Sequence, residues 1–164
     1  MATGEQRGHL TRGLDTAGLL RAQVREVHRE LDEAFAEWLR ARPPAATPTG
    51  SRVVALYVHA ATVEDITIHA LLRGVTPLYE TDWAGNGPAH YSTADLIPLR
   101  AYAQQVFAAT EAYLAGLAPD EASRTVDLSH LGQGQPTVAW VVSRFIVLQL
   151  AQIYGELTIA MRDS

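Results

Sequence analysis

The sequence predicts an all-α protein folded as a four-helix bundle. Four segments carry apolar residues at alternating intervals of three and four residues, which places them on one face of an α-helix. Two of the connections between these segments are long, as in bundles with crossover connections. A chain of 164 residues suits one domain with its own core. We therefore expect a flexible tail at residues 1–14 and a single domain at residues 15–164.

The first helix is predicted over residues 16–40. Asp15 or Thr16 can cap its start, because short polar side chains accept hydrogen bonds from the free N–H groups there. The stretch ARPPAATPTG ends it, since proline cannot continue a helix. Its apolar positions follow an a/d pattern over nearly three heptads: Leu20, Val24, Val27, Leu31, Ala34 and Trp38.

The second helix is predicted over residues 51–73 and ends at Arg73-Gly74. Its apolar positions are Val53, Leu56, Ala60, Val63, Ile66 and Ala70. A long irregular connection follows, with a turn rich in glycine and proline at residues 85–88. Connections of this length are unusual within a bundle and commonly serve as lids or crossovers.

The third helix is predicted over residues 93–117, with a capping box that begins at Ser92. A second connection, with a glycine turn at residues 132–134, leads to a fourth helix at residues 137–162. Thr137 can cap this last helix. Because it is apolar around most of its circumference, we expect it to be the most buried of the four.

The composition excludes several kinds of site. The chain has no cysteine, which excludes disulfides, thiolate zinc sites and cysteine nucleophiles. It has no lysine, which excludes Schiff-base and phosphate-loop sites built on that residue. No serine lies in the setting of a hydrolase nucleophile. The net charge is −5 and no basic stripe is present, so we expect no nucleic-acid partner.

No segment is expected to enter a membrane. The N-terminal stretch MATGEQRGHLTRG is polar and lacks the apolar core of a signal peptide. The longest apolar stretch, at residues 145–150, includes a glutamine and is too short to span a bilayer. We therefore expect a cytoplasmic protein.

Two stretches resemble the DinB-like (YfiT-like) superfamily of bacterial four-helix bundles. They are LYVHAATVEDITIHALLRG in the second predicted helix and QLAQIYGELTIAMRD in the fourth. The third predicted helix and the loop after it also resemble the corresponding parts of this superfamily, so the resemblance covers roughly residues 15–163. It implies a four-helix bundle of the same kind. Members of the family usually hold a divalent metal with three histidines, one from helix two and two from helix four.

The resemblance also implies that most of this metal site is lost. His59 matches the first ligand, and aligning the fourth helix on Gly155 puts Gln149 and Ile153 at the other two positions. Glutamine is a weak neutral ligand and isoleucine is none. We therefore expect no tightly bound metal and no other cofactor.

His59 is predicted to point into the bundle, because Val63, Ile66 and Ala70 lie within about 40° of it on the helical wheel. Two interpretations are open. A histidine there is either a core side chain left from a metal-binding ancestor, or a general base that apolar surroundings keep neutral.

A polar stripe marks the fourth helix. Gln149, Gln152 and Glu156 recur at i, i+3 and i+7 on an otherwise apolar helix. Buried polar groups are costly unless they are paired, so the stripe predicts a polar cavity, a hydrogen-bond network or an edge that reaches water. If helices two and four face each other, the stripe meets His59; His59 and Glu156 are then candidate catalytic groups, and Gln149 and Gln152 candidate ligand-binding groups. The alternative is a solvated edge or a dimer contact.

Other polar and aromatic residues border this region. Tyr102 lies beside the core stripe of the third helix and is expected to offer its hydroxyl to the cavity. Trp83 in the long connection and Trp140 in the fourth helix are expected to close the bundle end or cover a ligand. Glu64 and Asp65 lie well away from His59 on the wheel, so we expect them at the surface, in salt bridges or in subunit contacts. His69 lies about 80° from the His59 direction and is expected at the surface or at the border of the cavity.

Three functions agree with these features. The first is a small-molecule-binding protein or a metal-independent enzyme of isomerase, cyclase or transferase type, with His59 as the acid/base group. The second is the family's metal-dependent thiol transferase or isomerase activity, with a rebuilt ligand set of His59, Gln149 or Glu156, and His90 or His130. The third is a non-catalytic bundle that dimerises or binds a partner. We also expect a homodimer, because the fourth helix and the aromatic connection carry more apolar surface than one bundle covers.

Overall fold

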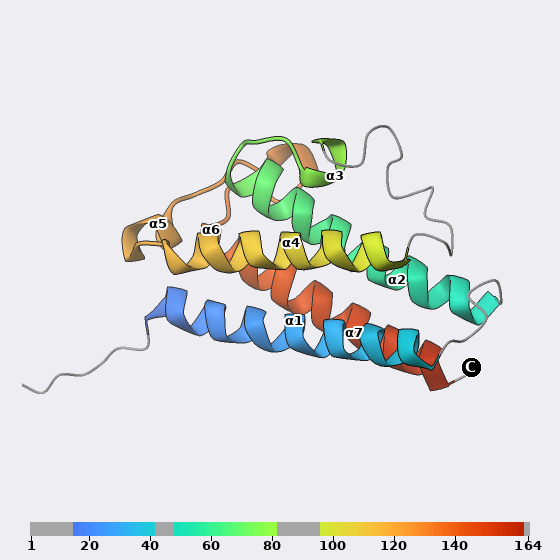
Figure 1. Ribbon diagram of the computed structural model, residues 1–164. Helices are drawn as coiled ribbons and strands as arrows, with labels where there is room; N and C mark the ends of the chain where they lie inside the picture. Colours follow the sequence, from blue (N-terminus) through green and yellow to red (C-terminus); the bar gives the residue numbers. More distant parts are fainter. Residues whose placement is uncertain (1–14, 42–47, 82–95, 163–164) are drawn as a thin grey trace, which may run out of the picture.

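The structure is a computed structural model that describes residues 15–41, 48–81 and 96–162, most of them helical (Figure 1). Its long segments are α1 (Thr16–Arg40), α2 (Pro48–Asp65) continued by the π-helical η1 (Ile66–Leu72), α4 (Leu96–Ala115), and a last helix made of α6 (Val138–Val141), the π-helical η5 (Val142–Leu148) and α7 (Gln149–Arg162). The described residues form no strand, only an isolated β-bridge between Thr125 and Thr137. The all-α prediction is confirmed.

Helix start signals in the sequence match the observed boundaries. Asp15 Oδ1 accepts a hydrogen bond from the backbone N–H of Ala17 at 3.2 Å, and the Thr137 hydroxyl accepts one from the N–H of Trp140 at 3.2 Å. The helices that follow these caps begin where they are predicted. The tail predicted at residues 1–14 and the capping box at Ser92 lie outside the described residues.

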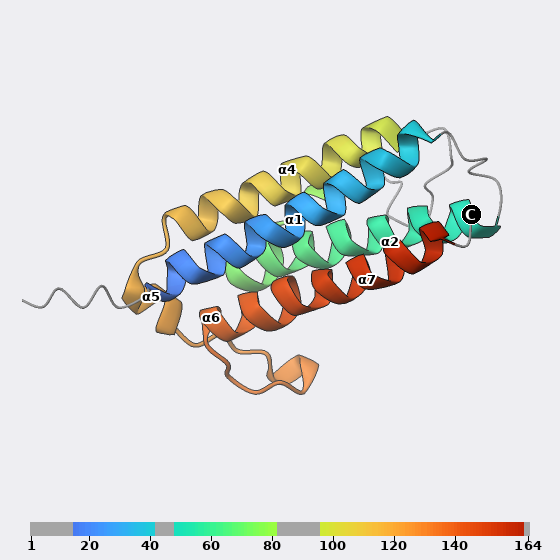
Figure 2. The same cartoon turned by 90° about the horizontal axis from the view of Figure 1, so that it is seen from below.

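The directions of the helices explain the length of the first connection. α1 and α7 run one way along the molecule, and α2 and α4 run the other way (Figures 1 and 2). The end of η1 and the start of α4 are therefore at opposite ends. The chain between Leu72 and Leu96 therefore has to return along much of α4, which is about 30 Å long at 1.5 Å per residue (Figure 1). This connection is a crossover, and the short α3 (Leu78–Thr81) lies on its path.

The second connection joins α4 to α6 at one end of the molecule. It contains α5 (Pro119–Ser123) and the 3₁₀ turn η4 (Ser129–Leu131). Gly132 and Gly134 have φ of 72° and 66°, a left-handed backbone that favours glycine. The predicted glycine turn is confirmed.

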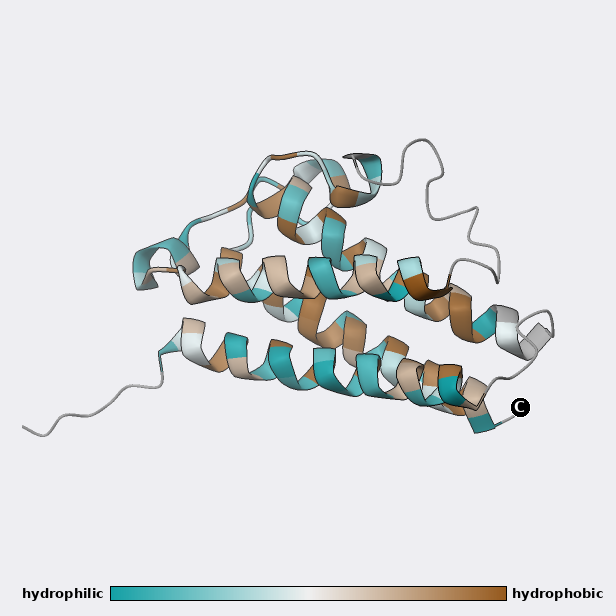
Figure 3. Cartoon of the chain, viewed as in Figure 1, coloured by the Kyte–Doolittle hydropathy of each residue, from teal (hydrophilic) through white to brown (hydrophobic). Residues whose placement is uncertain are grey.

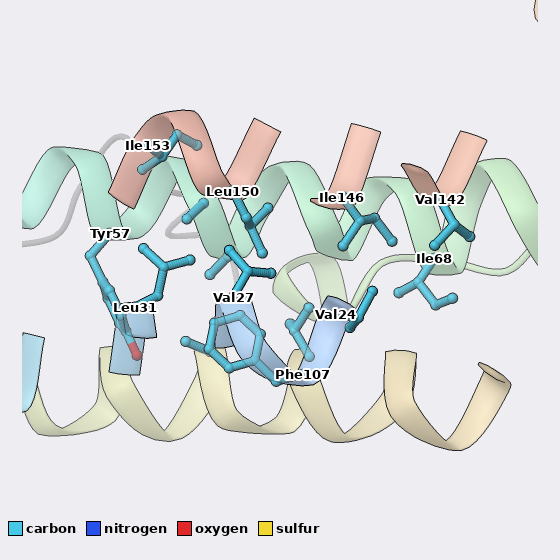
Figure 4. Packing of buried hydrophobic residues seen from close by; sticks show 14 of the residues in the cluster. Val24, Val27, Leu31, Tyr57, Ile68, Phe107, Val142, Ile146, Leu150 and Ile153 are labelled. Atoms are coloured by element: carbon cyan, nitrogen blue, oxygen red, sulfur yellow. The ribbon is translucent and has the colours of Figure 1, made fainter. Parts of the chain in front are cut away.

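Apolar side chains from the long helices meet in one core. Figure 4 shows Val142, Ile146 and Leu150 of the last helix directed toward Val24 and Val27 of α1. These five side chains are at most 4% exposed. Burying each stabilises the fold by roughly 1.5–3 kcal/mol, before the entropy of ordering is subtracted. The outer face of α1 is largely polar (Figure 3), as its heptad pattern requires.

The last helix is not the deeply buried element that its composition predicts. It exposes three large apolar side chains, Trp140, Leu148 and Ile159. Over Val138–Arg162 it is long and apolar enough to cross a membrane by length and composition alone, a property that core helices share. Only 33% of its most apolar window is buried in the chain, so an apolar face is left uncovered.

Candidate functional site

A buried histidine–carboxylate pair joins α1 to α2. His28 Nε2 lies 2.8 Å from Oε1 and 3.0 Å from Oε2 of Glu64, and Glu64 has no exposed surface. The His28 ring stacks on Phe107 of α4, with the ring centroids 4.1 Å apart. Taking a carboxylate out of water is costly unless a hydrogen-bonding partner compensates. The burial of Glu64 therefore depends on its hydrogen bond with His28.

His28 also lines an open groove between α1 and α4, with a volume of about 460 Å³. We name it the His28 groove; its lining residues are Arg25, His28, Arg29, Asp32, Gln104, Phe107, Ala108 and Glu111. Among the described residues, the buried His28 Nδ1 has no hydrogen-bond partner. Glu111 Oε1 lies 3.7 Å from Nδ1, and Glu111 Oε2 accepts a hydrogen bond from Arg25 Nε at 2.8 Å.

The contact with Glu64 sets the chemistry of the ring. A carboxylate only accepts hydrogen bonds, so in the neutral ring the proton belongs on Nε2, where it is donated to Glu64. Nδ1 then holds a free lone pair beside the groove. An imidazole nitrogen held in this way suits a general base or an acceptor for a bound ligand.

Asp32 lines the groove one helical turn from His28 and is held in place by several hydrogen bonds. Arg100 donates to both Asp32 oxygens at 2.9 and 2.8 Å, and the Tyr57 hydroxyl and the Gln104 amide donate as well. Burial acts to raise the pKa of Asp32, but the hydrogen bonds and charge of Arg100, with the other donors, outweigh it and lower that pKa. Burial, together with the Asp32 charge, raises the pKa of Tyr57 well above its usual value.

A second buried carboxylate ties the end of α2 to α4 and α3. Asp65 accepts hydrogen bonds from His69 Nδ1 at 2.7 Å and from the Tyr102 hydroxyl at 2.7 Å. It also accepts from the backbone N–H groups of Leu78 and Tyr79, each at 3.0 Å. Asp65 has no exposed surface, so these donors replace its water shell.

Glu64, Asp65 and His69 do not lie at the surface, because all three are buried. Of the alternatives predicted for the two carboxylates, the salt bridge is the one observed, with His28 and His69 as partners. α2 packs against α1, α4 and α7, so it has inner faces in more than one direction. Sequence reasoning also missed His28. The signal that could have found it is a titratable residue among the apolar positions of α1, between Val27 and Leu31.

The prediction that His59 points into the core is wrong, because its side chain is exposed. Gln149 and Glu156 are half-buried and Gln152 is exposed. In the part of the chain that the structure describes, no hydrogen bond joins His59 to these three residues; Gln152 Nε2 instead donates to Glu156 Oε1 at 3.3 Å. The polar stripe therefore lies on a partly solvated edge of the last helix.

The remaining predicted site residues are dispersed. Tyr102 is buried, and its hydroxyl donates a hydrogen bond to Asp65. Trp140 is exposed and meets Phe145 edge-on, with ring centroids 5.8 Å apart. Trp83 and His90 lie outside the described residues, and His130 is exposed. No group of three or more histidine, aspartate or glutamate side chains within the described ranges is arranged to hold a metal.

The chain matches no known family of proteins, no curated protein and no solved structure. Its function therefore has to be argued from its own residues. Of the groups described above, the His28 groove is where a buried, unpartnered titratable atom borders a groove.

Proposed function

We propose that this chain is a cytoplasmic small-molecule-binding protein or metal-independent acid–base enzyme, folded as a four-helix bundle of the DinB-like type. Its ligand binds in the His28 groove. The observation that supports this is His28 Nδ1, which is buried beside the groove without a hydrogen-bond partner among the described residues. Buried polar atoms rarely lack a partner, and those that do often have a functional reason.

The pair of His28 and Glu64 supplies the acid–base group. Glu64 holds the ring in one orientation by accepting a hydrogen bond from Nε2–H, and Nδ1 takes a proton from the ligand. The positive charge that forms on the ring is stabilised by the buried carboxylate behind it. This chemistry serves an isomerase, a cyclase or a transferase, and it needs no metal.

The test is a nuclear magnetic resonance screen with a panel of amines, alcohols, carboxylic acids and sugars. At least one class is expected to shift the signals of His28, Gln104 and Phe107. His28→Gln keeps a side-chain donor for Glu64 and removes the Nδ1 acceptor, so the shifts are expected to disappear. His130→Gln, at an exposed histidine away from the groove, is the matched control and should keep them. If no class shifts these signals, the groove is not a ligand site.

A second candidate role, the formation of a homodimer, is favoured by the last helix. Trp140, Leu148 and Ile159 are 40%, 51% and 56% exposed on the one helix over Val138–Arg162. Uncovered apolar surface of this kind is typical of subunit interfaces. We propose that a second copy of the chain covers it. This role is compatible with ligand binding, since the His28 groove lies between α1 and α4.

A further inference from the structure

We infer that the ligand of the His28 groove carries an ammonium group, and that Glu111 and His28 Nδ1 accept its hydrogen bonds. The inference rests on the proposed function and names the class of its ligand.

Two acceptors at the groove lie close together. Glu111 Oε1 is 3.7 Å from His28 Nδ1, and no hydrogen bond joins the two atoms within the described residues. With the ring proton on Nε2, both atoms are acceptors, so a group with several donors is needed to satisfy both. An ammonium group has three donors and no acceptor. A carboxylate ligand would add a third acceptor to the pair.

The positive side chains at the groove are already paired within the chain. Their ion pairs are Arg25–Glu111, Arg29–Glu26, Arg29–Glu33 and Arg100–Asp32. An anionic ligand would have to share a guanidinium group whose charge a carboxylate of the chain already neutralises. The pairing therefore favours a cationic ligand over an anionic one.

The charges around His28 also favour a cation. The carboxylates are Glu64 from α2, Asp32 from α1 and Glu111 from α4, and the guanidinium groups paired with them are Arg25 and Arg100. Beside a neutral His28 ring these groups leave one negative charge in excess. The flanking Arg29 adds no positive excess, because Glu26 and Glu33 both pair with it, and this group carries one further negative charge. A ligand with a positive charge reduces the negative excess at the groove.

A bound ammonium group also has a defined route for one proton. The N–H bond to the ligand nitrogen breaks and the proton moves to His28 Nδ1, while the bonding pair stays on the ligand nitrogen as a lone pair. The site keeps the same total charge, because the positive charge passes from the ligand to the ring between Glu64 and Glu111. The product is a neutral amine, which is a nucleophile.

The test compares three probes of similar shape: n-butylamine, n-butanol and butyrate. Binding to the full chain is measured by titration while the His28 ring signals are followed by nuclear magnetic resonance. We expect butylamine to bind more tightly than the other two. Glu111→Gln is expected to weaken butylamine binding about tenfold or more, the effect of losing one charge-assisted contact. Glu121→Gln is the matched control, since Glu121 pairs with Arg124 outside the groove; it should leave binding unchanged.

Each other result overturns the inference. Tighter binding of butyrate, or equal binding of butanol, means that the groove does not select a cation; the proposed function then stands and its ligand class changes. If none of the three shifts the His28 signals, the ammonium inference fails by itself. The wider panel of small molecules then decides separately whether the groove binds any ligand.

Discussion

His28 Nε2 lies 2.8 Å from Glu64 Oε1, in a contact that joins α1 to α2 beneath the surface. Glu64 has no exposed surface, and His28 keeps 4% of its own. Water cannot replace either partner when the other is removed, so the loss of one leaves an uncompensated polar group. The same contact leaves Nδ1 free beside the groove. Stability and the proposed chemistry therefore depend on one pair of side chains.

His28→Leu is expected to lower the free energy of unfolding by about 3–5 kcal/mol, because the Glu64 carboxylate stays buried without a partner. Glu64→Leu is expected to cost about 1–3 kcal/mol by leaving the Nε2 donor unpaired. The double variant should recover most of the loss, since apolar side chains tolerate the site. Urea unfolding of the single and double variants measures the coupling; strictly additive losses would show that the pair is not coupled. His130→Leu, at an exposed histidine, is the control.

Asp65→Asn is expected to destabilise the fold by about 2–4 kcal/mol, because an amide cannot accept from as many donors as the carboxylate does. Leu78 and Tyr79 donate their backbone N–H groups to different oxygens of Asp65, and the single oxygen of asparagine can replace only one of them. Hydrogen exchange at one or both of these amides should therefore become faster. Asp127→Asn is the control, because Asp127 is exposed and accepts only from a neighbouring turn. Unchanged exchange at Leu78 and Tyr79 would mean that Asp65 does not hold this segment.

The Asp32–Arg100 pair predicts a loss of stability in acid. The pKa of Asp32 is lower in the folded chain than its usual 3.8. Its contribution is therefore fully present above about pH 4 and is lost as the pH falls through the folded-state value. Both side chains are partly exposed, so we expect at most about 1 kcal/mol. In thermal unfolding, the melting temperature of the wild type should exceed that of Arg100→Met at pH 6, and this difference should shrink as the pH falls to about 3. Arg52→Met, at an exposed arginine outside this network, should keep the wild-type pH dependence.

His59→Ala is expected to change the free energy of unfolding by less than about 0.5 kcal/mol, because the side chain is exposed. Binding in the His28 groove should also be unchanged. Chemical unfolding and probe titration of the variant measure both effects. A loss of binding, or a destabilisation above about 1 kcal/mol, would contradict this prediction and show that His59 contributes to the functional site.

The homodimer proposal predicts that charges on the exposed face of the last helix separate the subunits. Leu148→Glu and Ile159→Glu should each give a monomer by light scattering at micromolar concentration, because a buried carboxylate without a partner is costly at an interface. Ile97→Glu is the control, since Ile97 is 82% exposed on α4. A wild-type chain that is already monomeric would contradict the proposal.

Local signals determined where α1 and the last helix begin, whereas α2 begins at Pro48 instead of the predicted Ser51. Asp15 and Thr137 cap their helices as predicted, and the proline-rich stretch separates α1 from α2. Caps, prolines and glycines act within a few residues, so one sequence is enough to interpret them. The sequence also predicted the long connection before α4, but it did not predict in which direction the connection runs along the bundle.

The helical wheel failed at the site for two physical reasons. α2 packs against three other long helices, so Glu64 and Asp65 are both buried although they point in different directions. The π-helical turns η1 and η5 hold more residues per turn than an α-helix, and they shift the faces of the residues that follow. A wheel drawn at 100° per residue therefore fails for His69 within η1, and it cannot carry a direction across η5 to the polar stripe, which begins at Gln149.

By itself the sequence determined an all-α chain, its main helix boundaries and the types of site that its composition excludes. Only the tertiary structure decided which polar side chains meet. His28 and Glu64 are 36 residues apart, and Asp65 and Tyr102 are 37 apart. Periodicity describes the faces of one helix, whereas these contacts depend on how separate helices pack. The candidate site therefore contains His28 and not His59, because packing buries His28 and leaves His59 exposed to water.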